Sequence, residues 1–142
     1  MEFQVRKATK NDMPSVLKLI NELAVYEREP DAVEVTVADL ERDGFGDQPL
    51  FNCFVAQAED KIVGMALFYN RYSTWKGKTI HLEDLIVNED YRGKGIGMQL
   101  YKKVMQFALE EKIKRVEWVV LDWNTPAVNF YKNTGASVFS EW

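Results

Sequence analysis

The residues with the clearest chemical potential are the glycines and cations gathered in one short segment, 90–97, which reads DYRGKGIG. Glycines let a backbone approach a ligand closely and turn its N–H groups inward. The segment precedes a predicted helix, whose N-terminus brings a positive dipole end to the same place. Together with the side chains of Arg92 and Lys94, these features predict an anion site suited to a pyrophosphate.

Two well-known phosphate-binding patterns share parts of this segment but fail on spacing. A Rossmann fingerprint requires G-x-G-x-x-G, and the position three residues after Gly95 is Met98 rather than glycine. A P-loop requires Ser or Thr after its G-K pair, whereas Lys94 is followed by Gly95. The segment instead reads R-x-x-G-x-G from Arg92 to Gly97. A plain glycine turn without a ligand is the alternative interpretation.

The chain's single cysteine and single histidine offer no second chemistry. Cys53 lies within the apolar run 51–55, so we expect a buried structural thiol rather than a nucleophile. One cysteine cannot form an internal disulfide, which favours a reducing compartment. His81 stands far from Cys53 in sequence and cannot make a metal site by itself, so we expect no metal.

Composition narrows the class of protein. The 142 residues suit one domain spanning 1–142, and 46% apolar with 28% charged residues is the balance of a globular fold. The net charge of −4 argues against a nucleic-acid partner, which would require a basic face. We find no signal-peptide stretch and no segment near the ~18 apolar residues of a membrane span. These features predict a cytoplasmic protein without a membrane partner.

The elements that position the glycine segment follow from the hydrophobic pattern. Apolar alternation and apolar runs predict strands at 3–8, 51–58, 62–70, 79–88, 115–121 and 136–142. Caps and helical periodicity predict helices that start at 11–14 and at Thr36, and further helices over 98–108 and 125–133. This order of strands and helices predicts an α/β sandwich around a mixed sheet.

Seven short segments carry a family resemblance that covers essentially the whole chain. They lie at 22–27, 43–49, 82–85, 90–93, 123–126, 129–132 and 135–137. With the R-x-x-G-x-G pattern, they resemble the GNAT superfamily, and within it the spermidine/spermine N1-acetyltransferases and the thialysine N-acetyltransferases. The resemblance implies the GNAT fold, a mixed, mostly antiparallel twisted sheet flanked by helices. That fold has a splayed pair of parallel strands at the acetyl-CoA site.

The resemblance also implies acetyl-CoA as the co-substrate and assigns its contacts. Backbone groups of Leu85, Ile86 and Val87 would bond to the pantetheine arm and the oxyanion. The segment that would hold the pyrophosphate comprises Arg92, Gly93, Lys94, Gly95, Ile96, Gly97 and Met98. Asn124, Ala127 and Tyr131 complete the implied set, although an asparagine at a strand end is equally typical of a helix cap.

Acetyl transfer to an amine needs a base and an acid, because a primary amine with a pKa of about 10 is protonated at neutral pH. The resemblance implies Glu83 as the base, acting through water. Strand alternation predicts that Glu83 and Asp84 point to opposite faces, so at most one should face the thioester. A plain strand-face charge is the alternative. Tyr131 is implied as the acid that protonates the departing sulfur, while Phe130 fits a packing role better.

The same resemblance places a further set of residues in the substrate site, namely Tyr26, Glu27, Glu83, Asp84, Glu117, Trp118 and Val119. An acidic channel with aromatic walls suits a small cationic amine, such as a polyamine or a thialysine-like diamine. The alternatives are core packing for Trp118 and Val119 and a solvated position for Glu27.

One departure from the family lies at the C-terminal end. Family members continue for another strand and short helix beyond 135–137, whereas this sequence stops at Trp142. In the family, that piece helps to form a homodimer and supplies an acidic substrate residue, for which Glu141 is the nearest equivalent. We therefore expect a homodimer, and a C-terminal strand that is short, missing or completed by a partner subunit.

Three functions follow from these observations. The leading hypothesis is an N-acetyltransferase acting on a small cationic amine. The second is acetylation of a protein lysine or N-terminus, and the third is a non-catalytic acyl-CoA-binding module. The presence of both Glu83 and Tyr131 argues against the module, since a chain released from chemistry need not keep them.

Overall fold

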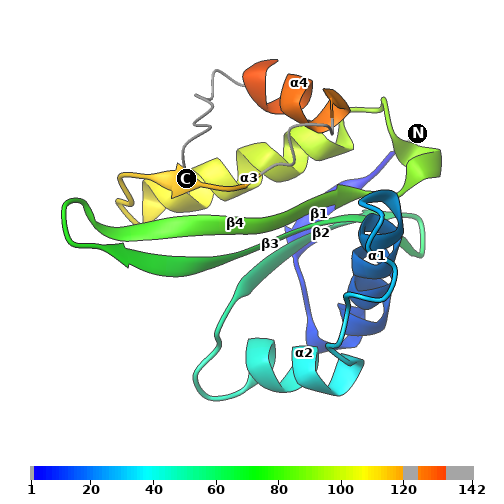
Figure 1. Cartoon of the computed structure of the whole chain (residues 1–142), viewed down its shortest axis with the longest axis horizontal. Coiled ribbons are helices and arrows are strands. Elements are labelled where there is room, and N and C mark those ends of the chain that lie inside the picture. The colour runs from blue at the N-terminus through cyan, green and yellow to red at the C-terminus, as the bar shows by residue number, and fades with distance from the viewer. Residues whose placement is uncertain (1, 120–124, 134–142) are drawn as a thin grey trace.

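The computed structural model describes residues 2–119 and 125–133. Within them, five strands form one sheet in the order β1-β2-β3-β4-β5. They are β1 (Gln4–Lys7), β2 (Asn52–Ala58), β3 (Lys61–Ser73), β4 (Gly77–Val87) and β5 (Val116–Glu117). Neighbours from β1 to β4 are antiparallel, and β4 and β5 are parallel. The predicted mixed, mostly antiparallel sheet is therefore confirmed (Figure 1).

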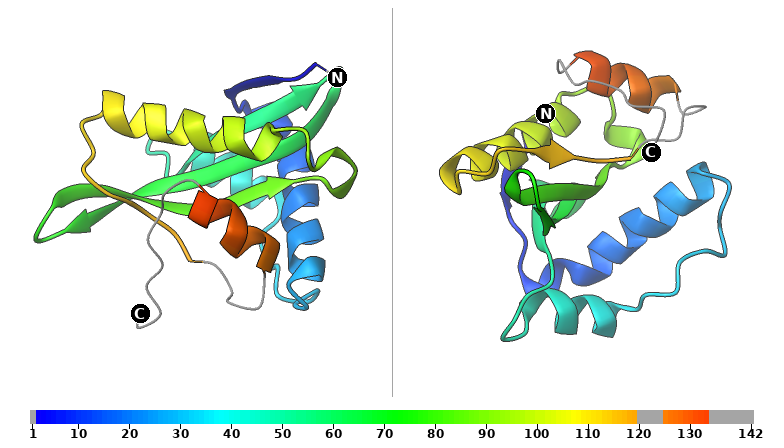
Figure 2. Two further views of the ribbon diagram at one scale, coloured as in Figure 1. Left: turned by 90° about the horizontal axis from the view of Figure 1, so that it is seen from above. Right: turned by 60° about the vertical axis from the view of Figure 1, so that its left-hand side comes forward.

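Helices cover both faces of this sheet, with α1 and α3 on opposite sides (Figure 2). The α-helices are α1 (Met13–Tyr26), α2 (Val37–Phe45), α3 (Ile96–Glu110) and α4 (Thr125–Asn133), and short 3-10 turns lie at Lys10–Asp12 and Glu89–Tyr91. No helix within the described ranges is long and apolar enough to cross a bilayer.

Each face of the sheet has its own apolar cluster. On the α3 side, the buried side chains include Phe68, Ile80, Leu82, Ile96, Leu100 and Val104. On the α1 side, they include Met13, Val16, Leu19, Val55, Met65 and Ile86, together with Cys53. Burial raises the pKa of the Cys53 thiol to about 12, which fits the predicted structural role rather than a nucleophilic one.

The predicted helix starts are confirmed. Helix α1 begins after Asp12 and carries Pro14 in its first turn. Thr36 caps α2 through a capping box: its Oγ1 accepts from the Asp39 N–H at 3.1 Å, and an Asp39 carboxylate oxygen accepts from the Thr36 N–H at 2.9 Å. The reciprocal pair satisfies two amide groups that the helix leaves without intrahelical partners.

One predicted strand is wrong in length. In place of a strand over 115–121, β5 covers only Val116–Glu117, because its pairing with β4 is limited to Ile80 and His81. Residues 118 and 119 leave the sheet. The rest of that prediction, and the predicted strand 136–142 with Glu141, lie outside the described residues.

A β-bulge interrupts the pairing of β3 with β4 beside the predicted base. Leu67 lies opposite Asp84 and Phe68 opposite Leu82, so Glu83 is an extra residue in β4. A bulge bends its strand and shifts the alternation of side chains.

The bulge changes which side of the sheet Glu83 and Asp84 face. Side chains packed on the α3 side are Ile80 and Leu82 before the bulge, and Leu85 and Val87 after it. Glu83 follows Leu82 and Asp84 precedes Leu85, so both acidic residues point away from α3. The prediction that they face opposite sides is wrong because it assumed uninterrupted alternation.

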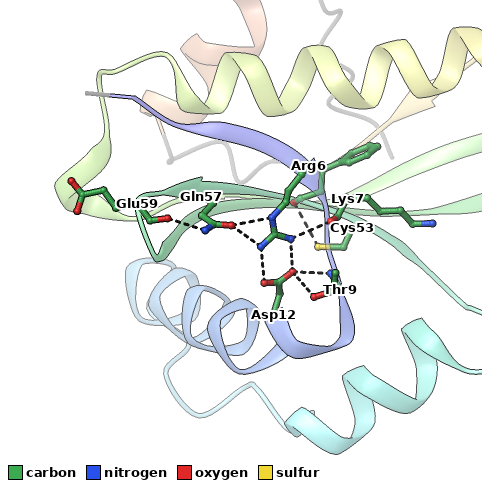
Figure 3. A network of polar contacts seen from close by, with 8 residues as sticks. Arg6, Lys7, Thr9, Asp12, Cys53, Gln57 and Glu59 are labelled. Atoms are coloured by element: carbon green, nitrogen blue, oxygen red, sulfur yellow. Dashed lines mark hydrogen bonds and ion pairs between the residues drawn. The ribbon is translucent and has the colours of Figure 1, made fainter.

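A buried polar network fixes the start of α1 to the edge of the sheet (Figure 3). Arg6 in β1 donates to both carboxylate oxygens of Asp12, at 2.8 and 3.0 Å, and to Gln57 in β2. The Thr9 N–H donates to the same carboxylate at 2.7 Å. These contacts hold the pKa of Asp12 below its ordinary value, the hydrogen bond from Arg6 being the largest cause.

Candidate active site

The glycine segment enters α3 with two backbone conformations that favour glycine. Gly93 has φ +78° and Gly95, which precedes α3, has φ +83°. No atom lies within 4 Å of where a Cβ would stand at either position. The glycines are thus required by the backbone conformation, and the space beside them is open to a ligand.

Arg92 is tied to the strand that precedes the segment. Its Nε donates to the carbonyl of Val87 at 3.2 Å, and its guanidinium lies 5.5 Å from the centre of the Tyr26 ring at the end of α1. A guanidinium held there adds positive charge beside the N-terminus of α3, where a phosphate is stabilised.

A cavity of about 410 Å³ opens at this place. It is lined by Leu23 and Tyr26 from α1, by Leu85, Ile86 and Val87 from β4, by Tyr91, Arg92, Gly93, Gly95, Ile96, Gly97 and Met98, and by Pro126, Ala127, Phe130 and Tyr131 from α4. Tertiary folding therefore brings together most of the predicted cofactor contacts. Its apolar walls and glycine cradle fit a long thioester cofactor with a pyrophosphate.

The cavity lies where β4 runs on beyond β5, while its other edge stays paired with β3. The described β5 pairs with β4 as far as His81, whereas β4 continues to Val87. Strand residues 85–87 line the cavity, and their backbone groups on this side have no β5 partner within the described residues. This is the geometry by which a strand edge can bond to an extended ligand.

Tyr131 forms the inner wall of the cavity and is 9% exposed. Its ring packs 4.8 Å from Trp118 and 5.2 Å from Phe130, centre to centre. Burial, and then the negative charge of Asp84, raise the pKa of its phenol well above the ordinary value. The phenol therefore keeps its proton at neutral pH and can donate it.

Asp84 is a partly buried carboxylate of the site. Burial is the largest cause that raises its pKa to about 6, and the charges of Glu83 and Glu27 act in the same direction. Burial also raises the pKa of Glu27, just beyond the end of α1. Asp84 has no hydrogen bond or ion pair among the described residues, so the negative charge of its carboxylate is uncompensated there.

Glu83 is more exposed than Asp84, with 51% of its side chain accessible. One of its oxygens accepts from the Tyr69 hydroxyl at 3.4 Å and lies 3.7 Å from Nε2 of His81. Its carboxylate is open to solvent, in keeping with the predicted role as a base that acts through water.

Three further residues were predicted to contact the substrate, namely Glu117, Trp118 and Val119. Glu117 is ion-paired with Arg71 and lies 3.5 Å from Nε of Arg115. Trp118 packs against the α3-side core and the Tyr131 ring. Val119 is 79% exposed. None of these three lines the cavity, so their contact with the substrate stays a prediction.

Two predicted cofactor contacts are not part of the lining. Lys94 is exposed and lies within the cradle between Gly93 and Gly95, and Asn124 lies outside the described residues. The lining in turn includes Leu23, Tyr91, Pro126 and Phe130, which the sequence analysis did not assign. All four stand within segments that carried the resemblance, and this was the available signal.

No cluster of three or more potential metal ligands occurs among the described residues.

The fold and the cavity together define an α/β protein with a glycine cradle at a helix N-terminus, suited to a phosphate-bearing cofactor, beside a strand that runs on past its parallel neighbour. Comparison with known families gives the same answer. Residues 13–136 match the model of the Acetyltransferase (GNAT) family. The chain belongs to the GNAT family of acetyltransferases, and it is an acetyl-CoA-dependent N-acetyltransferase.

Individual relatives support this assignment. The chain is 41% identical to a thialysine N-epsilon-acetyltransferase of Bos taurus over 145 residues, which cover 96% of the chain and 85% of the relative. It is 42% identical to the human spermidine/spermine N(1)-acetyltransferase-like protein 1, covering 94% of the chain but 20% of that longer relative.

Solved structures share the fold. An integron cassette protein from the mobile metagenome of V. cholerae superposes with a TM-score of 0.80 at 26% identity, over 100% of this chain and 90% of that one. An aminoglycoside acetyltransferase from an uncultured soil metagenomic sample reaches 0.81 at 23% identity, over 99% and 91%. The second likeness concerns the fold alone.

Proposed function

We propose that this enzyme acetylates a primary amine of a small cationic molecule, either a polyamine or a basic diamino compound of the thialysine type. The observation that carries the proposal is the arrangement of one cavity. Its glycine cradle and helix N-terminus suit a pyrophosphate, and Tyr131, which lines it, feels the charge of the partly buried carboxylate of Asp84. Thialysine and spermidine/spermine N-acetyltransferases among the relatives support the same substrate class.

In the proposed complex, the glycine segment holds the cofactor through backbone N–H groups. Gly93, Gly95 and the first turn of α3 face the pyrophosphate, and Arg92 and Lys94 add positive charge. Residues 85–87 of β4 pair with the pantetheine arm through their backbone. Asn124 and Ala127 are proposed as further contacts. Acetyl-CoA supplies an activated acyl group on a thiol leaving group.

The acidic residues of the site bind the amine. Asp84 and Glu27 attract a protonated ammonium group into a site where water is partly excluded, and Tyr26 offers an aromatic face. Glu83 accepts the ammonium proton through water, which frees the nitrogen lone pair to attack the thioester carbonyl. A backbone N–H of β4 stabilises the oxyanion that forms.

Tyr131 completes the transfer. As the carbon–sulfur bond breaks, its phenol gives a proton to the departing thiolate. The acylated nitrogen gives up its second proton through water to the resulting phenolate, which restores the phenol and leaves a neutral amide. The Tyr131 phenol is fully protonated before the reaction, and its donation is needed only in the transition state.

The experiment that tests this proposal is a thiol-release assay with acetyl-CoA and a panel of amines. The panel contains spermidine, spermine, putrescine, thialysine, lysine and a lysine-bearing peptide. We expect release with a small diamine or polyamine and none with the peptide. Release with the peptide alone would favour protein acetylation. Binding of acetyl-CoA without release for any amine would favour a binding module.

We further propose that the chain functions in the cytoplasm as a homodimer, each copy contributing a single GNAT domain over 1–142. A single buried cysteine fits a reducing compartment. At the tip of the β3–β4 hairpin, Trp75 is 92% exposed, as expected of an aromatic side chain at a contact surface. Light scattering coupled to size-exclusion chromatography tests the dimer, and a monomer at micromolar concentration would exclude it.

A further inference from the structure

The chain's only histidine lies next to the proposed base. His81 in β4 pairs with Glu117 in parallel β5 and with Tyr69 in antiparallel β3. Its side chain is only 12% exposed, and its ring stacks obliquely on Tyr69 with centres 5.3 Å apart. The imidazole is therefore held in one orientation by the strands on either side.

The two ring nitrogens of His81 face different groups. Nδ1 lies 3.4 Å from Nη1 of Arg71 and 3.9 Å from a carboxylate oxygen of Glu117, and Nε2 lies 3.7 Å from a carboxylate oxygen of Glu83. The guanidinium is therefore the nearer group to Nδ1. A guanidinium can only donate hydrogen bonds, so the nitrogen that faces it must accept. The neutral ring then carries its proton on Nε2, directed at Glu83.

Arg71 is itself held in place. Its Nη1 forms an ion pair with Glu117, and a second oxygen of Glu117 lies 3.5 Å from Nε of Arg115. Contacts thus run from Arg115 through Glu117 and Arg71 to His81, and end at Glu83. All of them lie among residues that the structure describes on β3, β4, β5 and the turn before β5.

We propose that His81 is a positioning residue for acetyl transfer, and that its Nε2–H, fixed by Arg71 on the opposite nitrogen, holds the Glu83 carboxylate in its proton-accepting orientation. This inference rests on the proposed function, in which Glu83 is the base. An exposed glutamate on a strand samples several rotamers, and a directed donor reduces that freedom. The contact of 3.7 Å is longer than a hydrogen bond, as is common before substrate binds.

The charges around His81 oppose one another. Arg71 from β3 and Arg115 before β5 are the cations near the ring, and Glu83 in β4 and Glu117 in β5 are the carboxylates near it. Tyr69 from β3 presents its ring and donates its hydroxyl to Glu83.

Nitrogen-15 NMR of the histidine side chain tests the contact without any substrate. With one histidine in the chain, the signals need no assignment by mutation. We expect the neutral ring to carry its proton on Nε2. Glu83→Gln should shift the Nε2 resonance, and Arg71→Met should shift Nδ1 and populate the Nδ1–H form. A ring protonated mainly on Nδ1, or an Nε2 resonance unmoved by Glu83→Gln, would overturn the proposal.

Kinetics test the consequence. We expect His81→Phe to lower kcat roughly tenfold with little change in KM, and His81→Gln, which keeps a donor, to recover most of that loss. In the Glu83→Gln background, His81→Phe should have almost no further effect. Equal losses in the Phe and Gln variants, or additive losses with Glu83→Gln, would show a structural role only.

A control variant completes the test, and failure of this inference can be distinguished from failure of the proposed function. Lys78→Met, at an exposed position of the same strand, should leave kcat unchanged. Failure of the proposed function is recognised separately, because wild-type protein would then release no thiol with any amine. In that case the NMR result still decides whether His81 directs its proton at Glu83.

Discussion

Two aspartates in this protein, the buried Asp12 and the partly buried Asp84, have opposite surroundings. Asp12 accepts from a guanidinium and a backbone N–H, and these contacts hold its pKa below the ordinary value. Asp84 lies beside two other carboxylates, and burial with their charges raises its pKa to about 6. The charge of the first carboxylate is compensated by Arg6, and the second has no such partner among residues 2–119 and 125–133.

The difference separates a structural site from a functional one. A compensated carboxylate ties β1, β2 and α1 together and has no charge left to bind a ligand. An uncompensated one destabilises the fold at neutral pH, and a cationic substrate can supply the missing partner. Perturbed carboxylates in clefts are typical of functional sites for this reason.

The largest expected effect concerns Tyr131, which belongs to the functional site together with Asp84. Tyr131→Phe removes the proton donor but keeps the ring, so kcat should fall by about 10²–10⁴-fold, the range typical of general acids. Acetyl-CoA affinity, measured by calorimetry, should change little. Tyr72→Phe, at an exposed tyrosine, serves as the matched control. Unchanged turnover in Tyr131→Phe would remove Tyr131 as the acid.

Breaking the compensated site should cost stability. Asp12→Asn leaves Arg6 without its charged partner, and we expect a loss of about 2–3 kcal/mol in the free energy of unfolding at pH 7. Because the folded pKa of Asp12 is lowered, its contribution is present above the unfolded pKa of about 4 and is lost as pH falls through the folded value. Urea unfolding at pH 7 and pH 3 measures this, and a gap between variant and wild type that does not narrow at pH 3 would contradict it.

Asp84→Asn should raise the free energy of unfolding at neutral pH, whereas Asp12→Asn lowers it. The folded pKa of Asp84 is raised to about 6, so its stabilising contribution is present below the unfolded pKa and is lost as pH rises through about 6. The variant should therefore be more stable than wild type at pH 7.5, by up to about 3 kcal/mol from 1.36 kcal/mol per pKa unit.

The same urea series, run side by side with Asp12→Asn, measures this gain, which should disappear below pH 4. Turnover of a cationic amine should fall at the same time, mainly through a higher KM. A variant that is less stable than wild type at pH 7.5 would show that Asp84 has a compensating partner.

The smallest expected effect concerns the glycine cradle of Gly93 and Gly95. Gly95→Ala places a side chain at φ +83°, a conformation that costs about 1–2 kcal/mol outside glycine. Acetyl-CoA should bind roughly tenfold more weakly by calorimetry. Gly77→Ala, at φ +82° in the β3–β4 turn, introduces the same strain far from the cavity. Equal acetyl-CoA affinity in the two variants would refute the pyrophosphate assignment.

The sequence by itself determined the parts of this protein whose signals are local. The cap at Thr36, proline in the first turn of α1, the hairpin strands and the glycine segment before α3 all follow from short-range patterns, and the structure confirms them. The family resemblance, also read from local segments, indicated the fold and the cofactor.

Only the tertiary structure decided how the charged groups are arranged. The bulge at Glu83 depends on how β4 pairs with β3, so alternation alone predicted the wrong face. The length of β5 depends on where it meets β4. Whether an aspartate has a cationic partner, as Asp12 has in Arg6, or lacks one among the described residues, as Asp84 does, depends on how the chain folds. Electrostatic energies vary with distance and solvent access, and neither quantity exists until the chain has folded.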